Sequence, residues 1–269
     1  IKAAIVPLGY WLPGAYAAAP APATVLFALM TKVGVYAVLR VGSVAFGPED
    51  GALAGLGQAA LLVLGIVTIG VAAIGSWAAR RLGSLAAFLV MLSAGTLVAS
   101  VSTGSVATVA GAIYYAAHST FAGALLFLLA DAIGHQRGEV ADALVTGPPI
   151  QQKVLLGLLF VLGAAATAGL PPFSGFIGKL MILQGTLGFP GVRWLWGAML
   201  AGGLFATVAL ARAGSRIFWK VGATPAAAAR LDPRELAAIA LLAACSVALT
   251  LFAAPAQRYA AATAAQLAA

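Results

Sequence analysis

The chain has 269 residues, of which 62% are apolar and 8% are charged. A soluble domain carries about 25% charged residues, so this composition excludes an ordinary soluble protein and makes lipid the expected solvent. On a soluble chain the net charge of +8 could suggest nucleic acid. Here most of that charge falls between apolar segments, and we expect lipid as the partner and no nucleic acid.

The chain starts with Ile1-Lys2-Ala3-Ala4, without a methionine and without the n-region of a signal peptide. We therefore expect it to begin inside a cut membrane helix whose upstream part lies outside the sequence. Pro7 and the Trp11-Leu12-Pro13 turn follow at once. This pattern suggests a broken helix in which Lys2 precedes the break at Pro7.

Apolar segments of spanning length follow along the chain. A spanning helix needs about 20 mostly apolar residues. The segments that meet this length lie at about 22–46, 54–79, 84–102, 105–134, 152–187 (interrupted), 194–220 and 234–255. A short alanine-rich tail follows Pro255. The predicted fold class is all-α: a polytopic transmembrane helix bundle with discontinuous helices.

Basic-rich and basic-poor loops alternate along the chain, which supports this set of helices. Lysine and arginine concentrate on cytoplasmic loops. This rule places the loops at 80–83, 135–152 and 212–234 inside, and the loop with Glu49 and Asp50 outside. The prediction is a multi-pass protein of the plasma membrane with its C-terminus outside.

Lys32 lies about ten residues into an apolar segment, near the expected bilayer centre. A lysine there costs about 2.5–3.5 kcal/mol on insertion scales, and such residues usually face a bundle interior or a wet cavity. The alternative is a structural ion pair, for which Asp131 is the plausible acid near a membrane segment. Arg40, near an outer helix end, is either functional or an anchor that reaches the interface.

Lys179 follows a strong helix-breaking pattern. Pro171 and Pro172 remove two backbone donors, and Gly175 comes shortly before the lysine. Unwound backbone at membrane depth is tolerated only inside protein or beside water, and transporter ion sites are built at such breaks. A kink would explain the prolines but would not explain the lysine.

His118 occupies the middle of an apolar helix. It is either a satisfied core residue or a proton relay, because an unperturbed histidine titrates near neutral pH. Four residues with hydroxyl groups lie within about a turn of it: Tyr114, Tyr115, Ser119 and Thr120. His135 is either a proton-uptake group at the inner mouth or a plain loop residue.

Other site chemistries find no support in the sequence. The single cysteine, Cys245, supports neither a disulfide framework nor a metal site. We find no phosphate-binding glycine loop, no Cys/His cluster and no Ser/His/Asp set. The prediction is therefore a protein without metal or cofactor that is not a soluble-type enzyme.

Taken together, these motifs resemble the proton-antiporter module shared by Mrp-type multisubunit Na⁺/H⁺ antiporters and the antiporter-like subunits of respiratory complex I. The resemblance spans nearly the whole chain. It rests on the Lys2–Pro7–Trp-Leu-Pro start, the Thr31-Lys32-Val33-Gly34-Val35-Tyr36 helix, His118-Ser119, and Gly169-Leu170-Pro171-Pro172 with Lys179. The Gly-Phe-Ile-Gly-Lys-Leu and His-Ser-Thr forms look most like the D-type branch of the Mrp family. Ala122 stands where the larger Mrp subunit usually has a lysine, and Gly9 and Gly14 replace the family's usual His and Asp.

The resemblance implies the C-terminal part of a fourteen-helix fold built from two inverted five-helix repeats. It implies that residues 1–46 end the first repeat, that 47–220 form the second, and that 221–269 hold the final transmembrane helix and a tail. It also implies a relay through Lys2, Lys32, His118 and Lys179. Arg40, Tyr114, Ser119, Thr120, Asp131 and His135 are accessory candidates.

The predicted function is a proton-translocating subunit of a monovalent cation (Na⁺)/proton antiporter, working with other membrane subunits. Two alternatives stay open. One is a proton-pumping subunit of an NADH-quinone oxidoreductase or a related respiratory complex. The other is a non-conducting scaffold subunit of a membrane complex.

Overall fold

The computed structural model describes residues 1–45, 55–220, 222 and 231–268. Glu49, Asp50 and Arg230, which the charge pattern used, lie outside these residues. The helices, in chain order, are α1 (Trp11–Ala18), α2 (Ala21–Ala45), α3 (Gln58–Ala78), α4 (Leu82–Val101), α5 (Val106–Arg137), α6 (Lys153–Ala168), α7 (Ser174–Gly185), α8 (Val192–Gly214), α9 (Pro233–Leu251) and α10 (Ala253–Ala268). Short 3₁₀ and π turns extend α5 over Gly138–Val140 and α8 over Ser215–Trp219.

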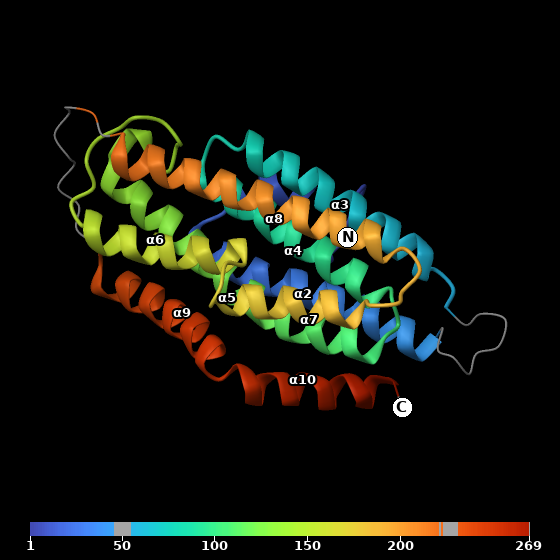
Figure 1. Ribbon diagram of the computed structural model, residues 1–269. Helices are drawn as coiled ribbons and strands as arrows, with labels where there is room; N and C mark the ends of the chain where they lie inside the picture. The colour runs from blue at the N-terminus through green and yellow to red at the C-terminus, as the bar shows by residue number, and fades with distance from the viewer. Residues whose placement is uncertain (46–54, 221, 223–230, 269) are drawn as a thin grey trace.

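The helices run roughly along one common axis and form an elongated bundle (Figure 1). Among the described residues, six helices are long and apolar enough to cross a membrane: α2, α3, α4, α5, α8 and α9. The prediction of an all-α transmembrane bundle is therefore confirmed. At 1.5 Å per residue, the 32 residues of α5 extend roughly 48 Å. This is longer than the hydrocarbon core of about 30 Å, so one or both ends of α5 lie beyond the hydrocarbon.

The predicted interruption of the span at 152–187 is also confirmed. Helix α6 ends at Ala168, Gly169 takes a left-handed φ of +81°, and α7 begins at Ser174. The two short helices follow one another along the bundle (Figure 1). Sixteen and twelve residues are each too few to span alone.

Helices α4 and α5 form the centre of the bundle. Almost every residue of α4 from Leu85 to Ser100 is buried, whereas α9 buries only Ile239, Ala243 and Ser246. Small residues bring α3 close to α4, because a Cβ on Gly65 would lie 2.7 Å from the backbone nitrogen of Ala99. Without a hydrophobic driving force in lipid, helices associate through such close contacts.

The loops at one end of the bundle are held together by backbone hydrogen bonds. The amide of Leu144 donates to the carbonyl of Arg80 at 2.8 Å, and the amide of Leu82 donates to that of Asp142 at 3.0 Å. We call this end, with the loops 79–81 and 138–152, the basic end. The C-terminus lies at the opposite end of the molecule (Figure 1).

Two predictions about the chain ends were wrong. Residues 1–10 form turns instead of a cut helix, and they lie against the middle of α2, where a Cβ on Gly34 would be 2.6 Å from the carbonyl carbon of Lys2. The segment after Pro255, predicted as a tail, lies within helix α10. Ala264 of α10 packs with Val109 and Ala110 of α5, so tertiary contact stabilises an alanine-rich helix of low hydropathy.

Candidate functional site

Lys32 on α2 points into the bundle and contacts a neutral oxygen. Lys32 is 7% exposed. Its Nζ donates a hydrogen bond of 2.7 Å to Oγ of Ser93 on α4. The ion pair with Asp131, the alternative interpretation, is not formed, because Asp131 instead faces His135 at 3.8 Å. Within the described residues, the ammonium group of Lys32 makes no salt bridge.

Lys179 on α7 contacts a carbonyl that the helix break releases. In a continuous helix, the carbonyl of Ala168 would accept from the amide of residue 172, but Pro172 has no amide hydrogen. Nζ of Lys179 donates to this carbonyl at 2.8 Å. Gly169 leaves room for the ammonium group, since a Cβ there would lie 2.9 Å from Nζ. The proline pair thus creates the acceptor that the lysine uses.

His118 on α5 lies against the same break. It is 1% exposed, and its Nδ1 is 2.9 Å from Oγ of Ser174 at the start of α7. Its close approach requires glycine at 175, because a Cβ there would lie 2.7 Å from Nε2 of His118 and would collide with the carbonyl of Ala166. The second break therefore brings a histidine of α5 and a lysine of α7 to the same part of the bundle.

Lys2 and Arg40 do not join this group in the part of the chain that the structure describes. Both residues are exposed. Residues 1–10 form turns that pack against α2 and α3, with Ala3 and Ala4 buried and the amide of Val6 donating to Oγ1 of Thr68 on α3 at 3.0 Å. The side chain of Lys2 stays on the exposed side of this segment. Pro7 lies within these turns and not at a break between two helices, and the structure does not place Lys2 with the other three residues.

The accessory candidates on α5 have local or peripheral partners. Ser119 and Thr120 both donate to the carbonyl of Ala116 one turn earlier, at 3.2 and 2.8 Å. The hydroxyl of Tyr114 donates to the carbonyl of Leu249 on α9 at 2.9 Å. Tyr114 therefore joins α5 to α9.

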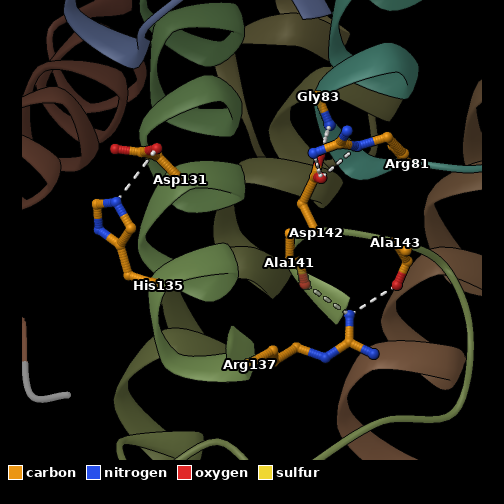
Figure 2. Close-up of polar contacts among 8 residues, drawn as sticks. All are labelled: Arg81, Gly83, Asp131, His135, Arg137, Ala141, Asp142 and Ala143. Atoms are coloured by element: carbon orange, nitrogen blue, oxygen red, sulfur yellow. Dashed lines mark hydrogen bonds and ion pairs between the residues drawn. The ribbon is translucent and has the colours of Figure 1, made fainter. Parts of the chain in front are cut away.

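A second polar group lies at the basic end, around a cavity of about 380 Å³ lined in part by Tyr16, Arg81, Asp131, His135 and Asp142. His135 is exposed, and its two ring nitrogens lie 3.8 Å from Asp131 and 3.9 Å from Glu235 of α9. Figure 2 shows Asp131 and His135 on one side of α5, and Asp142 with Arg81 on the other. The predicted position of Asp131 and His135 at a helix mouth agrees with this arrangement.

Two arginines fix the loop at the basic end (Figure 2). Arg81 meets Asp142 with its Nε and Nη2 both 2.6 Å from Oδ1. Arg137, counted from the sequence as a loop charge, is 1% exposed. Its guanidinium donates to three loop carbonyls, those of Ala141, Ala143 and Val145, at 2.6–3.2 Å. Arg137 is therefore a buried residue that holds the loop 141–145 against the end of α5, and it is not an exposed interfacial charge.

Three hydroxyl residues near the lysines and histidine were missed from the sequence: Ser93, Ser174 and Thr250. Thr250 on α9 accepts from the amide of Ser174 at 3.0 Å and so holds the start of α7. A serine or threonine in an apolar helix usually bonds a carbonyl of its own helix, and Ser93 does so, donating to Val90 at 2.7 Å. No local signal separates it from an ordinary helical serine.

The chain matches the sequence model of a family described as NADH:quinone oxidoreductase/Mrp antiporter, TM, over residues 1–208. It is 36% identical to the D subunit of a probable K(+)/H(+) antiporter from Rhizobium meliloti (strain 1021), over 98% of this chain and 54% of that protein. It is 34% identical to the D subunit of an Na(+)/H(+) antiporter from Bacillus subtilis (strain 168), over 69% of this chain and 37% of that protein. The chain therefore spans about half, or less, of these relatives.

Solved structures show the same fold. A chain in the structure of the Mrp complex from Dietzia sp. DQ12-45-1b superposes with a TM-score of 0.82 at 21% identity, over 99% of this chain and 57% of that one. A chain of respiratory complex I from Thermus thermophilus with bound NADH gives 0.78 at 23% identity, over 100% of this chain and 56% of that one.

Proposed function

Since the chain belongs to the NADH:quinone oxidoreductase/Mrp antiporter family, we propose that it conducts protons as part of a multisubunit monovalent cation/proton antiporter. Its partners are other subunits of a membrane complex. The relay consists of Lys32, His118 and Lys179, with Lys2 outside it. Relatives named as subunits of K(+)/H(+) and Na(+)/H(+) antiporters support a monovalent cation as the ion exchanged for protons. Na⁺ is the first cation to test.

One observation carries this proposal: the buried ammonium group of Lys32 and the partly buried one of Lys179 both bond neutral oxygens. Lys32 donates to a hydroxyl and Lys179 to a carbonyl. A lysine held by a carboxylate would leave a buried, uncompensated charge on losing its proton, which is costly. A lysine held by a neutral acceptor can exist in both states, and burial disfavours the charged state.

The proline break between α6 and α7 also supports a change of protonation at Lys179. Because Pro172 leaves the carbonyl of Ala168 without a helical partner, the ammonium group of Lys179 has an acceptor when charged. Polar backbone at membrane depth needs such a partner, a second protein group or water. Gain and loss of a proton at Lys179 therefore change the contacts at the break directly. The break places His118 at the same spot through Ser174.

The orientation and the repeat boundaries are part of the same proposal. The basic end faces the cytoplasm of a plasma membrane and the C-terminus faces outside, following the charge rule. Residues 47–220 make up the second repeat, which contains His118 and Lys179, and residues 1–46 bring Lys32 from the preceding one.

The test replaces Lys179 by alanine in the full-length chain within its native complex. Everted membrane vesicles are given an Na⁺ or a K⁺ pulse, and proton movement is followed with a pH-sensitive dye. We expect transport to fall to background while the complex still assembles. Lys153→Ala is the matched control, because Lys153 is an exposed lysine at the start of α6.

A normal rate in the Lys179→Ala complex would overturn the relay and support a scaffold role. Proton movement driven by NADH and not by a cation pulse would identify a respiratory pump instead.

A further inference from the structure

We propose that Ser93 of α4 and one water molecule beside it pass protons between Lys32 and His118. The inference rests on the proposed function and adds a residue and a site to it. Lys32 and His118 lie on α2 and α5, and among the described residues no hydrogen bond joins them directly. A relay through both residues needs a connection, and α4 lies in contact with both helices.

Ser93 has the bonding capacity that such a connection requires. Its Oγ accepts from Nζ of Lys32 at 2.7 Å and donates its one hydrogen to the carbonyl of Val90 at 2.7 Å. A serine hydroxyl has one hydrogen and two lone pairs. Ser93 can therefore keep accepting from Lys32 while its hydroxyl rotates the hydrogen away from Val90 to donate to a water.

A cavity of about 20 Å³ lies between Ser93 and His118. One water molecule needs roughly 10–15 Å³ and two to four polar partners, so the cavity has room for one water. Besides Ser93 and His118, its walls include Ser119 and Thr167. Both of these hydroxyls donate to carbonyls of their own helices, which leaves their oxygens free to accept from the water.

The proton transfer balances over these groups. The Nζ–H bond of Lys32 breaks as its proton passes to Oγ of Ser93, and the original hydroxyl proton of Ser93 passes to the water. The water gives one of its own protons to the ring nitrogen of His118 that carries none. One proton leaves Lys32, one arrives at His118, and both serine and water regain their starting composition. His118 then stands hydrogen-bonded to Ser174 on the helix that carries Lys179.

The first test is Ser93→Ala in the full-length complex, with proton movement in everted vesicles as the readout. We expect the rate to fall by roughly tenfold or more, since hydrogen bonds to charged groups are worth more than neutral ones. Ser93→Thr keeps the hydroxyl and should restore most of the rate. Equal loss in both variants, or no loss in Ser93→Ala, would overturn the role of Ser93.

The second test fills the cavity and leaves every titratable group in place. Ala206 of α8 lines the cavity and is 1% exposed, so Ala206→Val should displace the water and slow transport by a similar factor. Ala201→Val, on the exposed face of the same helix, is the control. Ala206→Ser keeps the volume small and should retain transport. If Ala206→Val assembles and transports normally, the water is not required and the inference fails.

These outcomes separate this inference from the proposed function. If Lys179→Ala abolishes transport while Ser93→Ala and Ala206→Val do not, the relay stands and its connection runs elsewhere. If Lys179→Ala transports normally, the relay itself is wrong. If the Ala206→Val complex fails to assemble, the comparison of Ser93→Ala with Ser93→Thr decides whether the connection runs through Ser93.

Discussion

Cations in the middle of the bundle and cations at its basic end differ in residue type and in how many fixed acceptors hold them. Lys32 and Lys179 each donate to a neutral oxygen. At the basic end, Arg81 meets a carboxylate, and Arg137 donates to three carbonyls at once. Both end residues are arginines, which do not deprotonate in proteins, and the interior residues are lysines, which do.

The difference separates two uses of positive charge. A permanently charged arginine with fixed acceptors holds the loop 138–147 against the helices. A lysine with one neutral acceptor can lose its proton at lower cost, because no buried carboxylate is left behind. Substitutions in the interior should therefore change transport, and substitutions at the basic end should change stability.

The largest expected effect is that of Lys32→Arg. Arginine keeps the positive charge and can bond Ser93, but it cannot release a proton. We expect transport in vesicles to fall by roughly a hundredfold, the lower range for loss of a positioned proton-transfer group. Arg81→Lys makes the reverse exchange at the basic end and should leave transport nearly normal. Substantial transport in Lys32→Arg would show that its charge, and not its proton, is what matters.

Next in size is Arg137→Gln, which should destabilise the fold. The substitution removes the guanidinium from the buried carbonyls of Ala141, Ala143 and Val145, and each unsatisfied buried group costs about 1–3 kcal/mol. We expect a clearly lower thermal unfolding temperature of the purified complex, with normal transport per assembled complex. Arg258→Gln, at an exposed position of α10, is the control. An unchanged unfolding temperature would mean that water replaces the guanidinium.

A smaller effect is expected from Pro172→Ala. The new amide can donate to the carbonyl of Ala168 and so compete with Lys179 for its acceptor. We expect transport to fall by roughly tenfold, the equivalent of about 1.4 kcal/mol, with assembly retained. Pro255→Ala, at an exposed position in the first turn of α10, serves as the control. A rate equal to that of the parent would show that Lys179 does not depend on the released carbonyl.

The smallest effect belongs to Asp142→Asn. The substitution weakens the pair with Arg81, whose side chain is 55% exposed whereas that of Asp142 is 10% exposed. It keeps an oxygen that can accept from the amide of Gly83, and we expect a loss of about 1 kcal/mol. We expect a slightly lower unfolding temperature and unchanged transport. Glu139→Gln, an exposed change in the same loop, provides the baseline. A strong loss of transport would place Asp142 in the proton pathway and weaken the contrast between interior and end.

The contrast was partly visible in the sequence. Lys32 and Lys179 stand in apolar segments, so their unusual depth follows from position alone. Arg137 stands at the end of an apolar helix, where an exposed interfacial arginine is the ordinary expectation. Its burial depends on the loop 141–145 folding back over it, and no local pattern in the sequence predicts this loop conformation.

The sequence by itself determined the spans, the break before Lys179 and the depth of the lysines. These depend on local quantities: the length of an apolar run, and the absence of an amide hydrogen at Pro171 and Pro172. Only the tertiary structure decided that Ser93, 61 residues from Lys32, accepts a hydrogen bond from its ammonium group, and that Lys2 is exposed. A hydroxyl satisfied within its own helix keeps a free lone pair, and only the packing of distant helices determines which group uses it.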